Sequence, residues 1–174
     1  QAAVFATGQM KCYDDELNEI GCNSEDYPGQ DALFHTGVLH SYIDNGDGTV
    51  KDNATGLVWQ KTPPTTGGWA NDGLMSWQEA LKYCKNLELA GYNDWRLPNV
   101  NELHSLVRYD RASPTPAIDT LFDFPARFAS PQDWKYWSSS SVVGLRSSAW
   151  GVSFYYGGIS NGFGKHEFSR VRAV

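Results

Sequence analysis

The chain has 174 residues, of which 41% are hydrophobic and 14% aromatic, and its formal net charge is −6 at pH 7. These values favour a single domain over residues 1–174 with a substantial core, with two smaller domains as the alternative. The negative charge argues against nucleic acid and anionic membrane surfaces as partners. No apolar run approaches the roughly 20 residues of a membrane-spanning helix, so no membrane insertion is expected. The sequence starts at Gln1, which a removed signal peptide and a trimmed fragment would explain equally well.

Residues 1–40 lack clear hydrophobic periodicity and are predicted to form an irregular N-terminal arm laid across the domain. Cys12 and Cys22 lie ten positions apart in a polar, acidic segment that a hydrophobic core could not easily order. We therefore expect a Cys12–Cys22 disulfide, with two free thiols as the alternative, and the bond implies an oxidising compartment. Cys84 lies among apolar residues at helical spacing and should be a buried, inert thiol.

Residues 41–60 contain short β-favouring runs separated by turn residues that tolerate positive φ, a pattern typical of successive hairpins. Asp44, Asn45, Asp47 and Asp52 also resemble part of a calcium loop. Because the closing glutamate of that loop is absent, the turn interpretation is favoured, and calcium binding at these four residues stays open.

Two short helices, joined by a tight connection, are predicted in the middle of the chain. Ser76 and Glu79 have the spacing of a capping box, and Asn99 and Glu102 repeat it before the second helix. We expect the first helix to end at Gly91. Each helix has an apolar stripe that should face the core. The stripes consist of Trp77, Ala80, Leu81, Cys84 and Leu87, and of Val100, Leu103, Leu106 and Val107.

The C-terminal third is predicted to return to strands after a long surface loop over residues 111–130, which contains three prolines. Trp150, Val152 and Phe154 alternate and should share one strand face. Residues 168–174 should form a closing strand beside the early hairpins.

No catalytic constellation is evident. The four histidines are scattered, no serine lies in a Gly-x-Ser-x-Gly elbow, and no phosphate-binding glycine loop is present. We therefore expect a non-enzymatic protein without a metal or cofactor.

The residues best suited to ligand binding lie between 134 and 166, in a part of the chain rich in Trp, Tyr, Ser, Gly and Asn. Residues 111–174 hold seven basic and four acidic residues, so an anionic ligand should prefer this third. Trp137, Trp150 and Phe154 are better explained as core residues. The candidate ligand-binding residues are Arg146, Tyr155, Tyr156, Asn161, Phe163, Lys165 and His166.

Several motifs together resemble the Lcl C-terminal domain family, which is named after a domain of a bacterial collagen-like adhesin. The resemblance spans nearly the whole chain. The clearest motifs are Asp44-Asn-Gly-Asp-Gly-Thr-Val50, Asp52-Asn-x-Thr-Gly-Leu-x-Trp59, Trp77-x-x-Ala-x-x-x-Cys84, Gly91-Tyr-x-Asp-Trp-Arg-Leu-Pro98, Tyr136-Trp-Ser-Ser-Ser140 and Val171-Arg-Ala-Val174.

This resemblance implies a C-type-lectin-like α+β fold, with two short helices against a small twisted antiparallel sheet and long loops. It also implies an extracellular, cell-surface or periplasmic location and a homotrimer as a candidate assembly. Glycans, including sulfated glycosaminoglycans, are the implied ligands, and binding or assembly with a host or surface protein is the alternative. Trp95 to Pro98 also looks like enzymes related to formylglycine generation, but their copper-binding cysteine pair has no counterpart here. Family members often have a cysteine at the position of Ala173, where it pairs with the helix cysteine, so Cys84 lacks this partner.

Overall fold

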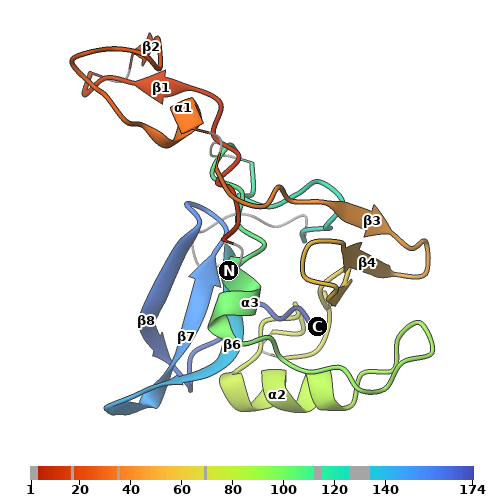
Figure 1. The fold of residues 1–174 in the computed structure, drawn as a ribbon. Coiled ribbons are helices and arrows are strands. Elements are labelled where there is room, and N and C mark those ends of the chain that lie inside the picture. The colour runs from red at the N-terminus through yellow and green to blue at the C-terminus, as the bar shows by residue number, and fades with distance from the viewer. Residues whose placement is uncertain (1–3, 17, 35, 69, 112–114, 126–133) are drawn as a thin grey trace.

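The computed structural model describes residues 4–16, 18–34, 36–68, 70–111, 115–125 and 134–174. Within these ranges the chain is an α+β fold of short helices and small antiparallel sheets, as predicted. Figure 1 shows the two three-stranded sheets on either side of helix α3 and the C-terminal segment, with helix α2 below them in this view.

The N-terminal arm forms a small lobe. Strands β1 (Cys12–Tyr13) and β2 (Glu19–Ile20) pair as an antiparallel hairpin, followed by helix α1 (Asp31–Phe34). The predicted disulfide is present, with 5.1 Å between the Cα atoms of Cys12 and Cys22. In Figure 1 this lobe extends away from the rest of the molecule. Its base is attached through backbone hydrogen bonds, including one from Tyr109 N to Thr7 O of 3.1 Å.

The predicted hairpins are confirmed. Strands β3 (Tyr42–Asp44), β4 (Thr49–Asp52) and β5 (Val58–Gln60) form an antiparallel sheet in chain order. The acidic residues accept hydrogen bonds within their own turns: Gly46 N donates to Asp44 at 3.0 Å, and Ala54 N to Asp52 at 2.9 Å. Carboxylates that satisfy backbone N–H groups in this way stabilise tight turns without an ion.

Both predicted capping boxes are confirmed, at the starts of α2 (Trp77–Lys85) and α3 (Val100–His104). At α3, Asn99 N donates to Glu102 Oε2 at 2.8 Å, and Glu102 N donates to Asn99 Oδ1 at 2.9 Å. The two reciprocal bonds satisfy N–H groups that have no partner inside the helix.

The predicted end of the first helix at Gly91 is wrong, because α2 ends at Lys85. Asn86 leaves the helical conformation, and the chain then makes a separate turn in which Leu89 and Tyr92 pair and Ala90 and Gly91 both have positive φ. Gly91 thus belongs to this second turn rather than to the helix cap. The connection between the two helices is therefore longer than expected.

The core consists of two clusters of buried side chains. The first cluster joins β4, β5 and α3 to one face of the C-terminal sheet, and the second joins α2 to the other face. The first contains Val50, Trp59, Leu103, Leu106, Val107, Ala117, Ile118, Phe122, Trp134, Tyr136, Val152 and Phe154. The second contains Met75, Ala80, Cys84, Trp95, Leu97, Trp137, Ala149, Phe163, Val171 and Ala173.

Strands β6 (Lys135–Val142), β7 (Leu145–Ser153) and β8 (Gly158–Gly164) form the C-terminal sheet, which therefore lies between the two clusters. Val152 of β7 and Phe154 just after it are buried in the first cluster, and Ala149 of β7 is buried in the second cluster on the other face. Trp150 has the alternation predicted for the face of Val152 and Phe154 but is only partly buried. The register shift between Ala149 and Gly151 adds a residue to β8 rather than to β7.

The predicted surface loop over residues 111–130 is also wrong in its described part. Ala117, Ile118 and Phe122 are at most 4% exposed and complete the first core cluster. The backbone is fixed there as well, since Ala117 N donates to Phe154 O at 2.8 Å. Prolines exclude helix and central strand but permit an extended segment to pack its side chains inward.

The C-terminal segment does not form the regular strand predicted for residues 168–174. It makes isolated bridges between Ser169 and Met75 and between Arg170 and Tyr136. Ala173 O accepts a hydrogen bond from Gln60 N of β5 at 3.0 Å. Because its backbone partner changes every few residues, the segment fastens several elements together instead of extending one sheet.

Candidate functional site

The predicted ligand-binding residues lie along the β7–β8 hairpin, but not on one continuous surface. Tyr155 and Tyr156 occupy the turn after β7, whereas Arg146 lies near the start of β7 and Lys165 just after β8. At about 3.3 Å per residue, the two ends of the hairpin are roughly 25–30 Å apart. The structure therefore divides the candidate site into an aromatic end and a basic end, with exposed Asn161 between them.

The aromatic end consists of Tyr109, Tyr155 and Tyr156. The Tyr156 side chain is 76% exposed. Its ring centroid lies 4.2 Å from that of Tyr155, and Tyr155 in turn makes an edge contact with buried Trp134 at 5.2 Å. The hydrogen bond with Tyr155 raises the pKa of Tyr156. An exposed ring is thus supported from behind by a half-buried and then a fully buried ring.

Tyr109 joins this end from another part of the chain, and no sequence pattern predicts it. Its hydroxyl donates to Gly157 O at 3.3 Å and lies 2.8 Å from Nε2 of His104. Burial lowers the pKa of His104, which keeps this imidazole neutral at pH 7. The pairing depends on the close approach of α3 and the β7–β8 turn, which no local pattern predicts.

Gly157 is required at this turn for two reasons. Its φ is +75°, and an added Cβ would lie 2.5 Å from Cγ1 of Val107. We expect Gly157→Ala to lower the free energy of unfolding by about 2–3 kcal/mol, through backbone strain and overpacking. Urea unfolding measures this loss. Gly158→Ala is the matched control, because an added Cβ there has no atom within 4 Å; equal losses for the two variants would contradict the argument.

At the basic end, the ammonium group of Lys165 is already engaged. It donates to Ser141 Oγ at 2.8 Å and to Arg146 O at 2.9 Å, and it lies 4.3 Å from the centroid of the Trp77 ring. Arg146 and His166 are exposed. This end therefore presents less available positive charge than the sequence indicates.

The positive C-terminal third does not become a positive surface. Arg170 is 2% exposed and Arg172 is fully buried. Residues 1–40 contain seven acidic residues and one basic residue, so their charge of −6 equals that of the whole chain. The expectation that anionic ligands prefer the C-terminal third therefore loses much of its physical basis.

Phe163, one of the predicted ligand-binding residues, is 1% exposed and belongs to the second core cluster. Its ring contacts Trp137, with 5.5 Å between centroids. The ring fits there because Gly151 has no side chain: a Cβ on Gly151 would lie 2.7 Å from the Phe163 ring. Phe163 is therefore a core residue rather than part of an exposed binding surface.

Among the described residues, no group of three or more His, Cys, Asp or Glu side chains is arranged to hold a metal ion. Cys84 is a buried free thiol, as predicted, and burial raises its pKa to about 12. No helix in the described ranges has the length and apolar character needed to cross a membrane.

The fold defines a small α+β domain built on antiparallel sheets, in which turns and connections present the exposed side chains. The Lcl C-terminal domain model matches residues 48–174, and the chain therefore belongs to the Lcl C-terminal domain family. This membership makes it a module of the type associated with surface adhesins. No curated protein and no solved structure matches the chain significantly.

Proposed function

We propose that this chain is a non-enzymatic, extracytoplasmic binding module that recognises glycans through the aromatic end of the C-terminal sheet. The observation that supports this most is the exposed Tyr156 ring, which Tyr155 and Trp134 hold in place. Aromatic faces provide apolar area for the C–H surface of a sugar ring, and a phenol hydroxyl supplies a hydrogen bond. The Cys12–Cys22 disulfide supports a location outside the reducing cytoplasm.

The proposal also includes a C-type-lectin-like fold and a homotrimeric assembly on the cell surface or in the periplasm. Charge favours glycans without dense sulfation over heparin-like chains, because two of the C-terminal arginines are buried and the Lys165 ammonium is engaged. Sulfated glycosaminoglycans should be included in the glycan array as a separate class of ligand.

A glycan array tests the proposal, with the affinity for each positive glycan measured for the wild type and Tyr156→Ala. We expect Tyr156→Ala to weaken binding roughly five- to tenfold, because stacking on the ring is lost. Folding should be unaffected, since most of this side chain is exposed. Tyr13→Ala is the matched control, because Tyr13 is an exposed tyrosine on strand β1 of the N-terminal lobe. No bound glycan, or equal effects of the two variants, would contradict this site.

A protein partner is the second candidate function, and the β6–β7 turn supports it. Val143 is 99% exposed and Leu145 is 53% exposed, so this turn presents apolar side chains to solvent. Apolar side chains exposed on a turn are available to pack against a protein partner, although only larger contiguous patches mark an interaction site by themselves. A pull-down from a surface extract, carried out with the wild type and with Val143→Ser, distinguishes this function from glycan recognition. A protein that the wild type captures and Val143→Ser does not would support a protein partner.

A further inference from the structure

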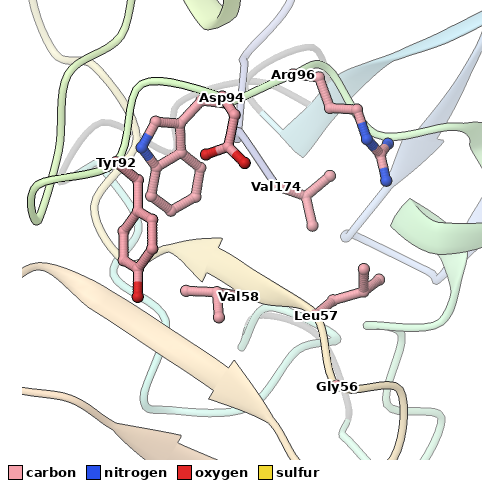
Figure 2. Close-up of a pocket in the computed structure, with 8 residues that line it drawn as sticks. Gly56, Leu57, Val58, Tyr92, Asp94, Arg96 and Val174 are labelled. Carbon is pink, nitrogen blue, oxygen red and sulfur yellow. The ribbon is translucent and has the colours of Figure 1, made fainter.

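The connection between α2 and α3 forms an open pocket with β5 and the C-terminal segment. Its volume is about 280 Å³. Leu57, Val58 and Val174 supply apolar side chains, while Tyr92, Asp94 and Arg96 supply aromatic and charged groups. Figure 2 shows Tyr92 and Arg96 on opposite sides, with the carboxylate of Asp94 between them and the side chains of Leu57 and Val58 below in this view. The pocket therefore combines an apolar wall with one acidic and one basic side chain.

The two charged side chains are not equivalent. Arg96 makes a bidentate ion pair with Glu102, with two N–O distances of 2.7 Å. This pair is internally neutral, and the carboxylate raises the pKa of Arg96. In contrast, no hydrogen bond or ion pair joins Asp94 to another residue of the described ranges. The charge available to a ligand is therefore the negative charge of Asp94.

The aromatic side of the pocket is supported by the core. Tyr92 is 55% exposed, and its ring makes an edge contact with Trp95, with 6.4 Å between centroids. Trp95 is only 5% exposed, and its indole N–H donates to Leu89 O at 3.3 Å. Backbone hydrogen bonds in both directions between Arg96 and Val174, each of 3.0 Å, fix the opposite side. The ligand-facing groups are thus held by fixed backbone and buried side chains.

We propose that this pocket binds the side chain of a lysine or arginine on a partner polypeptide. The cation would pair with Asp94 and lie near the face of Tyr92, where the ring quadrupole attracts positive charge. The aliphatic stem would pack against Leu57, Val58 and Val174, as the stems of basic side chains do on apolar surface. A volume of about 280 Å³ is below the usual range for drug-sized ligands but suits one long side chain.

The polar groups that line the pocket favour a basic side chain over a sugar as the ligand. Sugar hydroxyls need several donors and acceptors, whereas the pocket offers one carboxylate without a partner beside apolar side chains and a paired guanidinium. This site is distinct from the proposed glycan surface at Tyr156, which lies on the β7–β8 turn. Either proposal can therefore fail without the other.

The test is an NMR-monitored titration of the isotopically labelled full chain. The ligands are a Gly-Lys-Gly peptide that is acetylated at its N-terminus and amidated at its C-terminus, and the corresponding Gly-Arg-Gly peptide. We expect saturable shifts of the amide signals of residues 57–58 and 92–96. Asp94→Asn should weaken binding roughly fivefold, the magnitude of one exposed charge contact. A peptide with norleucine in place of lysine lacks the positive charge and should bind more weakly than the lysine peptide. Butylamine tests whether an amine that is not part of a peptide binds as well.

Asp26→Asn is the matched control, because it removes an exposed carboxylate in the N-terminal lobe; it should leave peptide binding unchanged. Three results would overturn the proposal: no shift at the pocket with either basic peptide, equal affinity for the norleucine peptide, or an equal loss in Asp94→Asn and Asp26→Asn. Binding of butylamine as tight as that of the lysine peptide would replace the polypeptide partner with a free amine. Glycan affinity measured on Asp94→Asn should equal that of the wild type.

Discussion

Replacing Arg172 with methionine is expected to lower the free energy of unfolding by about 3–5 kcal/mol. The guanidinium is fully buried and donates to three backbone carbonyls, those of Gln60, Lys61 and Asp123. Burial lowers the pKa of Arg172, and no carboxylate is paired with it among the described residues. Methionine fills a similar volume but removes the guanidinium donor from all three carbonyl oxygens. Lys61 O still accepts from Asp123 N at 3.1 Å, so the main cost falls on the Gln60 and Asp123 carbonyls, because a buried acceptor that loses its donor is costly.

Aromatic rings add to this stabilisation, because the Arg172 guanidinium lies 5.0 Å from the ring centroid of Phe122 and 5.7 Å from that of Tyr136. Urea unfolding monitored by tryptophan fluorescence measures the loss. Arg146→Met is the matched control on an exposed arginine and should change stability by less than about 0.5 kcal/mol. A difference of less than 1 kcal/mol between the two variants, on the order of the measurement error in extrapolated values, would contradict the role assigned to Arg172.

Ala173→Cys is expected to create a disulfide with Cys84 and to raise stability by about 4–5 kcal/mol, because the bond would close a loop of about 90 residues in the unfolded chain. Both positions are fully buried and lie in the second core cluster. The Cys84 thiol has no disulfide partner, and its raised pKa of about 12 makes it unreactive in the folded state. The new bond should therefore form during oxidative folding rather than afterwards.

Thiol titration of the unfolded protein should detect no free thiol in Ala173→Cys and one in the wild type. Thermal unfolding with and without reductant then gives the stabilisation. The control is Ala173→Cys in a Cys84→Ala background, which introduces the same side chain without a partner. Two free thiols in the oxidised variant would show that the two positions do not meet the geometry of a disulfide.

The candidate site could be predicted only in part. Tyr156 is exposed, as expected for a residue beside a glycine-rich turn, but Phe163 is buried because of the cavity that Gly151 leaves on a neighbouring strand. Tyr109 reaches the same region because its hydroxyl donates to Gly157 O of the β7–β8 turn, in a segment distant along the chain. Charge was the least predictable property, since formal charge does not distinguish an exposed arginine from Arg172.

The sequence by itself determined the features that depend on residues close together in the chain. The capping boxes need two residues three positions apart, the hairpin turns need Gly and Asp at fixed offsets, and the Cys12–Cys22 bond closes within one short segment. Only the tertiary structure decided the burial of Arg172 and Phe163 and the inward packing of residues 117–122. It also divided the basic and aromatic residues between opposite ends of one hairpin. These outcomes depend on which distant segments fill the same space, and packing of that kind leaves no periodic or local pattern in the sequence.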